Sequence, residues 1–371
     1  MAEININIAG DFIDSFIYSG VLFTVDTNGV LCSYSWRNLV DNYFRKYPAH
    51  SHYHRKVLDC REEDHSIIKK DITIVFEKEF LEKNQKGTCC DLDVWTTDLD
   101  VKDNILYISS ERGLVSLPFL EEWDNGKIMK FNQLIPLWKE AKVFGLSTGS
   151  WGRTILAAGD NGALEIMNNG VEQLQKIGFH KKKEKVIDSN ICLDCEWSSN
   201  STLAILDGLN SKAMYMFDSI ESDSRFKESN KSNKRNQKKI TEDDIKKIAI
   251  ILKNEKAKNI SKNEIQHSWF EDGRLYAVDS NNKRFYFKGD SWVEVQGWEL
   301  NDSDAVVKLK NITAGNFIET DSDELYRVAN GKKEFLSNDF TSWRVFPRSK
   351  NYQDRIHVVK DEYLQIKIFN V

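Results

Sequence analysis

Apolar and polar residues alternate along most of this chain in short runs, and tight polar turns join the runs in pairs. Each pair is an apolar run, a turn rich in Asp, Asn, Ser or Gly, and a second run with a period of two. That pattern predicts a β-hairpin, because successive side chains of a strand point to opposite faces and polar turn residues let the chain reverse. Seven segments have it: Ser19–Trp36, Asp103–Phe119, Gly152–Asn168, Ser201–Asp218, Gly273–Gly289, Gly315–Gly331 and Asp354–Asn370.

Further strands are expected on both sides of these hairpins. Apolar runs that end in tryptophan precede three of them, at Leu92–Trp95, Asp194–Trp197 and Ile265–Trp269. Candidate fourth strands follow at Ile72–Glu77, Lys127–Phe131, Val171–Ile177, Trp292–Trp298 and Lys333–Ser337. A four-stranded unit that recurs every ~40–45 residues is the period of a propeller blade, and the longer intervals imply insertions.

The segment Asp194–Asp218, "DCEWSSNSTLAILDGLNSKAMYMFD", resembles the repeat unit of the WD40-type β-propeller family. It contains a strand, a Trp-Ser turn, an inner strand, an Asp turn, a third strand and a final aromatic-Asp pair. Asp26–Trp36 and Gly159–Asn168 match the Asp-x-x-Gly turn and the strand after it. The Gly-His pair and the closing Trp-Asp dipeptide of that family are absent. The resemblance implies an all-β WD40-like propeller and names no particular member.

The two ends of the chain are expected to share one blade. Ile4, Ile6 and Ile8 alternate in a single N-terminal strand without a nearby hairpin partner. The C-terminal part supplies three strands, Ser342–Phe346, Asp354–Val359 and Tyr363–Phe369. Three strands plus one complete a seventh blade and cover an otherwise open sheet edge. We therefore expect one seven-bladed domain over residues 1–371.

The first insertion, residues 37–71, interrupts blade 1. The run Asn38–Pro48 predicts a short helix that ends near the proline. His50, His52 and His54 follow at the alternation of a strand, which would place them on one face, where three histidines could hold zinc. Exposed loop histidines without a metal are the commoner case, and we predict no metal and no cofactor here.

The second insertion, residues 219–263, lies near blade 4 and is strongly basic. From Arg225 to Lys262 there are thirteen Lys and Arg against five Asp and Glu, a net charge of +8 (13 − 5), so the rest of the chain carries −13 of the total of −5. Its first half has few apolar residues and is expected to be disordered, and its second half has the pattern of a short amphipathic helix. Either it is a solvated loop with a helix against the propeller, or it binds a partner. The residues predicted to bind a partner are Lys234, Arg235, Lys238, Lys239, Ile245, Lys246, Lys247, Ile248 and Leu252.

Cysteine usage and the N-terminus predict an intracellular protein, cytoplasmic or nuclear. The six cysteines have no disulfide-framework spacing and are expected to be reduced. Cys192 and Cys195 form a lone CxxC within a predicted strand, where their sulfurs would face opposite ways. No signal peptide is expected at the N-terminus, and no apolar run is long enough to cross a membrane.

No enzyme motif stands out in the chain. The stretch Gly145–Gly152 contains Gly-x-Ser-x-Gly-like pieces, but Ser147 and Ser150 are expected in a loop at the start of a blade rather than between a strand and a helix. The recurring Asp26, Asp160, Asp207, Asp279 and Asp321 lie in turns, where Asp bonds the backbone.

The leading hypothesis is a non-catalytic interaction scaffold, a subunit of a multi-protein complex that binds other proteins through its faces and insertions. The alternatives are a nucleic-acid-associated subunit that uses residues 225–262, since lysine-rich segments contact phosphate without base selectivity, and a propeller hydrolase with a site at the mouth of the channel.

Overall fold

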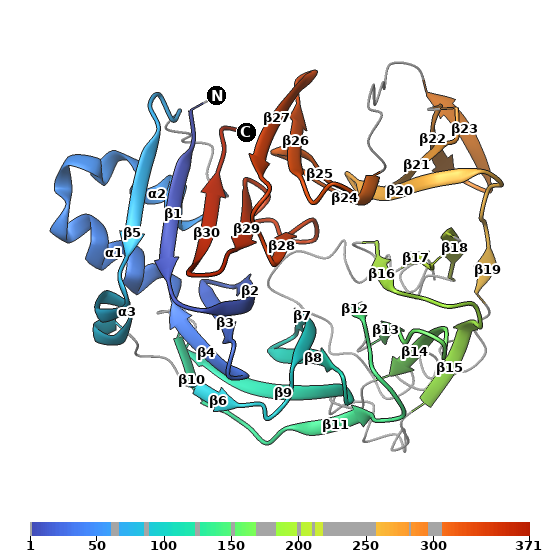
Figure 1. Ribbon diagram of the computed structural model, residues 1–371, viewed down its shortest axis with the longest axis horizontal. Helices are drawn as coiled ribbons and strands as arrows, with labels where there is room; N and C mark the ends of the chain where they lie inside the picture. The colour runs from blue at the N-terminus through green and yellow to red at the C-terminus, as the bar shows by residue number, and fades with distance from the viewer. Residues whose placement is uncertain are drawn as a thin grey trace, which may run out of the picture. The chain divides into compact units, whose positions relative to one another are not determined.

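The structure is a computed structural model that describes residues 2–60, 67–84, 89–122, 127–149, 153–167, 183–198, 202–209, 212–217, 257–281, 283–295 and 306–371. Within these ranges the strands form seven separate sheets (Figure 1). Two compact units make up the chain, one of Met1–Pro136, Trp269–Asp272 and Gly297–Val371, the other of Leu137–Ser268 and Gly273–Gln296.

Six of the sheets contain four strands that run up and down in chain order, which is the arrangement of a propeller blade, and the seventh takes its fourth strand from the N-terminus. Blade 1 consists of β2 (Phe12–Tyr18), β3 (Val21–Asp26), β4 (Val30–Ser35) and β6 (Cys89–Asp91). Blade 2 consists of β7 (Thr96–Lys102), β8 (Ile105–Ser110), β9 (Gly113–Glu122) and β10 (Lys127–Phe131), and β11 (Ile135–Trp138) also pairs with β9. Blade 3 consists of β12 (Gly145–Thr148), β13 (Arg153–Ala157), β14 (Ala163–Met167) and β15 (Lys183–Asp188).

Blades 4 to 6 repeat this order. Blade 4 consists of β16 (Asp194–Trp197), β17 (Leu203–Asp207), β18 (Lys212–Met216) and β19 (Lys258–Asn259). Blade 5 consists of β20 (Ile265–Glu271), β21 (Arg274–Asp279), β22 (Arg284–Lys288) and β23 (Ser291–Val295). Blade 6 consists of β24 (Val306–Ile312), β25 (Gly315–Thr320), β26 (Leu325–Ala329) and β27 (Lys332–Ser337).

Blade 7 joins the two ends of the chain, as the sequence predicts. It contains β28 (Ser342–Val345), β29 (Arg355–Val359), β30 (Tyr363–Ile368) and β1 (Ile4–Ala9). β1 runs antiparallel to β30 with Ile4 opposite Ile368 and Ile8 opposite Leu364. All seven predicted hairpins are confirmed as paired strands. The chain is a mostly-β, seven-bladed propeller closed by strands from both termini.

Two strand predictions are wrong or differ in place. Ile72–Phe76 is β5, which pairs in parallel with β1 as a fifth strand of blade 7 and is not the fourth strand of blade 1. Its Ile74 and Phe76 are buried in the same apolar cluster as Ile4 and Ile6, and periodicity alone does not distinguish these partners. Leu92–Trp95 is not a strand, because a turn with Asp93 at φ +51° interrupts it and leaves Trp95 exposed.

The other flanking predictions hold wherever the structure describes them. Strands that contain the predicted tryptophan occur at β16, which ends at Trp197, and at β20, which continues past Trp269 to Glu271. Predicted fourth strands occur at β10, β23 and β27. The predicted strand at Val171–Ile177 lies outside the described residues, and β15 is the fourth strand of blade 3.

The first insertion folds into helices and is longer than expected. It runs from the end of β4 to the start of β6 and holds α1 (Trp36–Lys46), a 3-10 helix (Pro48–Tyr53), α2 (His54–Leu58), β5 and α3 (Lys78–Asn84). Ser35 caps α1 by accepting the Asn38 N–H at 3.2 Å, and the helix ends just before Pro48, as predicted. The strand alternation inferred for the three histidines is wrong, because Pro48 begins a helical segment there.

Arg355 fastens this insertion to blade 7. Its Nη1 donates to the Val57 carbonyl at 2.8 Å and its Nε to Asp354 Oδ1 at 2.8 Å, and the side chain is fully buried. Trp36 Nε1 donates to the same Val57 carbonyl at 3.1 Å. Burial would lower the pKa of Arg355, but the Asp354 carboxylate outweighs it and raises that pKa, so the guanidinium stays charged. The carbonyl groups at the end of α2 are thereby satisfied inside the core.

The second insertion ends earlier than predicted, since Lys258 and Asn259 form β19 and pair with Met216 and Tyr215. Most of the insertion, residues 218–256, lies outside the described residues. Like the first insertion, it interrupts the connection between the third and fourth strands of a blade.

Neighbouring blades within each unit share apolar clusters. In the first unit one cluster joins blades 1 and 7 with the helices of the insertion, a second joins blades 1 and 2, and a third joins blades 6 and 7. In the second unit a cluster around Trp197 joins blades 3 and 4. The Trp197 ring also packs against the tilted Phe217 ring at a centroid distance of 4.8 Å, and the Arg153 guanidinium lies 5.1 Å from each ring centroid. This burial holds adjacent blades together within each unit.

Candidate functional site

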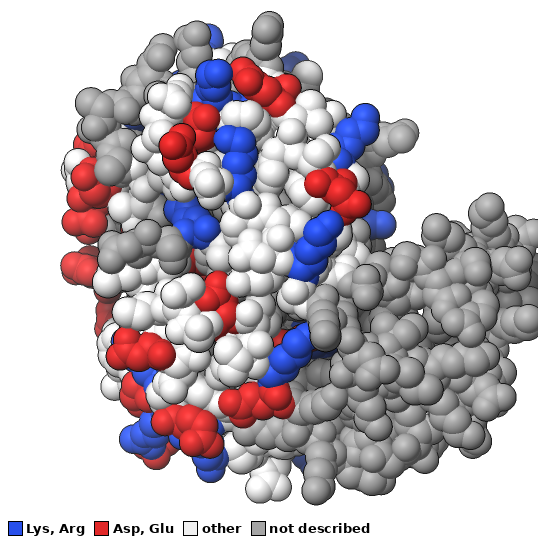
Figure 2. Space-filling view, turned by 90° about the vertical axis from the view of Figure 1, so that its right-hand side faces the viewer, with Lys and Arg blue, Asp and Glu red and all other residues white. Residues whose placement is uncertain are grey.

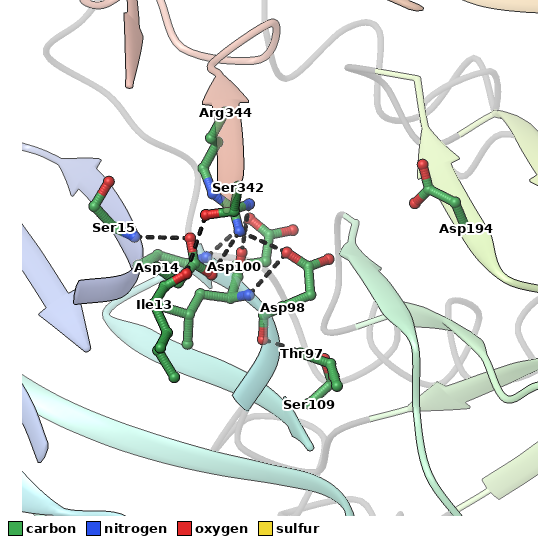
Figure 3. Close-up of polar contacts among 12 residues, drawn as sticks. Ile13, Asp14, Ser15, Thr97, Asp98, Asp100, Ser109, Asp194, Ser342 and Arg344 are labelled. Carbon is green, nitrogen blue, oxygen red and sulfur yellow. Dashed lines mark hydrogen bonds and ion pairs between the residues drawn. The ribbon is translucent and has the colours of Figure 1, made fainter. Parts of the chain in front are cut away.

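A polar cluster joins the first strands of blades 1, 2 and 7 (Figure 3). Arg344 on β28 donates from Nη2 to Asp14 Oδ2 at 2.8 Å and to Asp98 Oδ1 at 2.7 Å. Its Nη1 donates to the Leu99 carbonyl at 3.0 Å, and Ser342 Oγ donates to the Ile13 carbonyl at 3.0 Å. One guanidinium therefore connects three blades of the first unit.

Strand geometry explains why these side chains meet. Asp14, Asp98 and Arg344 lie on the first strands of blades 1, 2 and 7, and their charged groups meet where these strands come together. Asp100 on β7 forms an ion pair with Arg348, which follows β28. The signal in the sequence was the charged positions within the runs "FIDSFIY", "TTDLDVK" and "SWRV", and our sequence reasoning missed it.

Two carboxylates share the Arg344 charge, and this sets the electrostatics. Burial and the neighbouring Asp98 raise the pKa of Asp14 even though Arg344 opposes them. Burial alone would lower the pKa of Arg344, but Asp14 and Asp98 together raise it, so the guanidinium stays protonated.

A buried histidine lies beside this cluster. His357 is fully buried, with Nδ1 2.9 Å from Ser15 Oγ and its ring 4.8 Å from that of Phe346. Burial and the charges of Arg355 and Arg344 hold its pKa well below the usual value, so the imidazole is neutral. Ser15 and His357 come from blades 1 and 7 and add a second polar contact between the blades that Arg344 joins.

Arg344 and Arg348 form hydrogen bonds with Asp14, Asp98 and Asp100 of the same protein. These bonds hold the first strands of blades 1, 2 and 7 in place, and binding of a partner is then expected from side chains on the loops.

The histidines of the first insertion have structural contacts of their own. His54 Nε2 lies 2.6 Å from Asp41 Oδ1, and the His52 ring packs on Tyr53 at 3.8 Å. Among the described residues, no group of three or more His, Cys, Asp or Glu side chains is arranged to hold a metal ion. His65 lies outside those residues.

The cysteines differ from the expectation of six reduced thiols. Cys32 on β4 and Cys89 on β6 face each other across the ladder and form a disulfide. Cys192 precedes β16 rather than lying within it, and both Cys192 and Cys195 are buried in one apolar cluster. Burial, with Asp194, Asp207 and Asp188 nearby, raises the pKa of Cys192 to about 12, so this thiol is protonated at neutral pH.

Asp26 and Asp279, two of the five turn aspartates, have the structural role that the sequence predicts, whereas Asp207 ends β17 and pairs with Lys212. Asp26 Oδ1 accepts the N–H groups of Asn28 and Val30 at 2.9 Å each. Asp279 Oδ1 accepts those of Asn281 and Lys283 at 2.9 and 3.0 Å. In each hairpin turn, the Asp side chain at the start of the turn thus binds two backbone N–H groups that follow it.

The prediction that Ser147 lies in a loop is wrong. Ser147 is part of strand β12, where it is buried and its Oγ accepts the Trp197 N–H at 3.0 Å. Ser150 lies outside the described residues.

The predicted partner-binding residues between Lys234 and Leu252 all lie outside the described residues. On the face drawn in Figure 2, the described Lys and Arg alternate with Asp and Glu, and neither sign covers a broad area. Exposed ion pairs of blades 4 and 5 join Lys258 to Asp290 at 3.1 Å and Lys283 to Glu294 at 3.8 Å. Within the described part of the chain, no helix is both long and apolar enough to cross a membrane.

Seven blades, with one blade shared by the two termini, define the class of this protein as a seven-bladed β-propeller. No known family model matches the sequence. No curated protein sequence matches it either.

Solved structures that the chain matches include other propellers at low identity. A structure of YCF48 bound to D1 peptide is 10% identical, covers 100% of this chain and 96% of its own, and has a TM-score of 0.49. The Pan2 WD40 domain of Neurospora crassa is 8% identical over 98% of this chain and 90% of its own, with a TM-score of 0.45. Sqt1 of Saccharomyces cerevisiae is 9% identical over 97% and 84%, with a TM-score of 0.47. The fold class rests on the seven sheets and their strand order.

Proposed function

We propose that this protein is a non-catalytic interaction scaffold, a subunit of a multi-protein complex that binds other proteins through loops at the ends of its blades. The observation that carries the proposal is a set of large apolar side chains exposed in the loops of a framework whose inner strands are joined by ion pairs. The first strands of blades 1, 2 and 7 are tied together by buried ion pairs, whereas large exposed apolar side chains such as Trp95, Phe144 and Leu209 lie in connections between strands. A rigid framework that presents apolar loop residues is suited to binding, because little conformational freedom is lost on contact.

A tagged pull-down from the native cell at moderate and at high salt tests this proposal. Protein partners at stoichiometric amounts that survive high salt are expected. Recovery of the protein alone would contradict the scaffold function. Metal analysis and a broad hydrolase screen on the purified chain should both be blank, and a positive result in either would favour the propeller hydrolase.

A second candidate function is nucleic-acid association through the basic segment 225–262, which the net charge of +8 favours. Phosphate contacts of Lys and Arg weaken steeply as salt rises. Deleting residues 225–256, which leaves β19 in place, should then abolish salt-sensitive RNA or DNA binding. Unchanged binding, or no binding by the full chain, would reject this function.

The proposal includes an intracellular location, cytoplasmic or nuclear. It is supported by the free thiols of Cys60, Cys90, Cys192 and Cys195, while the Cys32–Cys89 bond argues against it. Fractionation of the native cell, followed by immunoblotting, tests the location.

A further inference from the structure

Four connections of blades 3 and 4 meet at one end of these blades. In an up-and-down sheet, the connection into the first strand and the turn between the second and third strands emerge at the same end. Backbone hydrogen bonds join them here: Phe144 N–H donates to Ala157 O at 2.8 Å, Gly159 and Cys192 exchange bonds at 2.9 and 3.1 Å, and Leu193 N–H donates to Asp207 O at 2.7 Å. This end of blades 3 and 4 is therefore a continuous surface within the second unit.

Exposed apolar side chains lie along these connections. Phe144 is 38% exposed, Ile191 is 41% exposed and Leu209 is 64% exposed. The Phe144 ring lies against Gly159, where a Cβ atom would come within 2.7 Å of Cε2, so only glycine leaves room for the ring. Gly159 also has φ +57°, a conformation that favours glycine. The backbone is thus shaped to hold an aromatic ring at the surface.

Carboxylates surround the apolar side chains. Asp160 is exposed in the turn of blade 3. Asp188 accepts hydrogen bonds from neutral groups, the Asn190 N–H at 2.9 Å and the Tyr215 hydroxyl at 2.8 Å, which leave its negative charge in place. Asp207 pairs with Lys212 at 2.9 Å. The negative potential that Asp188, Asp194 and Asp207 produce at this end also contributes to the high pKa of the buried Cys192.

We propose that the loop surface of blades 3 and 4, made by Phe144, Ile191, Leu209, Asp160 and Asp188, binds a segment of a partner protein that carries Arg or Lys beside a leucine-sized apolar side chain. Apolar groups of the partner cover Ile191 and Leu209, and its cation is attracted by the carboxylates. The Phe144 ring face already accepts a cation in the protein itself, since Lys142 Nζ lies 4.5 Å from the ring centroid. Charge complementarity selects a basic segment over an acidic one. The inference rests on the proposed scaffold function and names the surface and the chemistry of its partner.

Two pools of short synthetic peptides test this inference on the full-length protein. The pools are identical except that one carries Arg and the other Glu next to a fixed Leu. The Arg–Leu pool should bind, more weakly as salt rises, and the Glu–Leu pool should not. Binding that is equal for both pools, stronger for Glu–Leu, or absent for both would overturn the proposal.

Substitutions then locate the binding surface. Ile191→Asp and Leu209→Asp should each weaken Arg–Leu binding about tenfold or more, about 1.4 kcal/mol, and Asp188→Asn should reduce its salt dependence. Val186→Asp is the matched control, because Val186 is an exposed aliphatic residue of β15 in the same unit and outside the surface. Unchanged binding in Ile191→Asp and Leu209→Asp, with melting temperatures like that of Val186→Asp, would place the peptides elsewhere.

Two further outcomes distinguish a partner protein from the chain's own basic segment as the occupant, and the loop-surface proposal from the scaffold function. If deleting residues 225–256 tightens Arg–Leu binding, the chain's own basic segment occupies the surface and the partner proposal fails. If Ile191→Asp retains all partners in the pull-down, this surface is rejected while the scaffold function stands.

Discussion

Arg344 provides the sharpest test of how the blades of the first unit are held together. Replacing it by methionine removes the charge and all three hydrogen bonds while keeping an unbranched apolar side chain. Asp14 and Asp98 would then face each other without the Arg344 charge in a largely buried place. Removing one partner of a buried ion pair costs about 3–5 kcal/mol, and we take about 3 kcal/mol because the Arg344 side chain is 21% exposed.

The expected loss can be converted to a melting temperature. With an unfolding entropy of about 2.1 cal/mol/K per residue, a chain of 371 residues that unfolds as one unit has about 0.8 kcal/mol/K. A loss of about 3 kcal/mol then lowers the melting temperature by about 4 °C. Calorimetry at neutral pH, together with denaturant titration, measures both quantities.

The pH dependence of the Arg344→Met defect gives an independent check. Without Arg344, the pKa of Asp14 should rise further above its ordinary value, so the folded state binds a proton more readily than the unfolded state. Lowering the pH through this range then favours the folded state, and the difference between Arg344→Met and the native protein should shrink as pH falls from 8 to 5, a range of about three units. Asp14→Asn should cost less than Arg344→Met, because Arg344 keeps Asp98 as its partner.

Arg112→Met is the matched control for Arg344→Met. The Arg112 side chain is 65% exposed and lies 3.5 Å from Asp93, so its loss should cost less than about 0.5 kcal/mol. The reasoning is refuted if Arg344→Met is no more destabilising than Arg112→Met. It is also refuted if the Arg344→Met defect grows as the pH falls.

Three other predictions follow from local geometry. The Cys32–Cys89 disulfide joins residues that are 57 positions apart, so alkylation of the denatured, unreduced chain should label four of the six cysteines. Reducing this bond should lower the free energy of unfolding by about 4 kcal/mol or less, because the unfolded chain regains loop entropy. Labelling of all six thiols would contradict the bond. Gly162→Ala should lower the free energy of unfolding more than Gly289→Ala in a denaturant titration. Both glycines have positive φ, but only at Gly162 would a Cβ atom come within 2.2 Å of a backbone oxygen. Equal losses would refute this steric argument. Burial lowers the pKa of His267 to about 4, so the unfolded state takes up a proton at this residue before the folded state does. The free energy of unfolding should therefore fall as the pH drops below 6.5, by about 1.4 kcal/mol at pH 5.5. His267→Gln should remove this pH-dependent loss, and a pH profile like that of the native protein would refute the prediction.

Local pattern determines most of the architecture. Seven period-2 hairpins with Asp and Gly turns predict seven blades, because turn chemistry and strand alternation act between residues close in the chain. The alternation of Ile4, Ile6 and Ile8, together with three C-terminal strands, predicts the shared blade. The α1 helix and its end at Pro48 follow from local signals as well.

Long-range pairing is where sequence reasoning failed. Ile72–Phe76 has the pattern of a strand, but the choice between blade 1 and a parallel place beside β1 depends on which apolar cluster buries Ile74 and Phe76. Cys32 and Cys89 are 57 residues apart, and only the register of β4 against β6 brings them together. Leu92–Trp95 has the composition of a strand, and the turn at Asp93 that breaks it has no clear signal in the sequence.

The polar cluster and the loop surface were decided by tertiary structure alone. Asp14, Asp98 and Arg344 lie far apart in the chain, and each looks like an ordinary solvated charge in a strand. Only the packing of three first strands brings both carboxylates within 3 Å of the Arg344 guanidinium. Phe144, Ile191 and Leu209 likewise come from separate connections that backbone hydrogen bonds join at one end of two blades. Local pattern alone predicts the repeated four-stranded blade, because its strands and turns are close in the chain. Contacts between blades decide which charges pair and which apolar residues share a surface, and these contacts exist only in the folded protein.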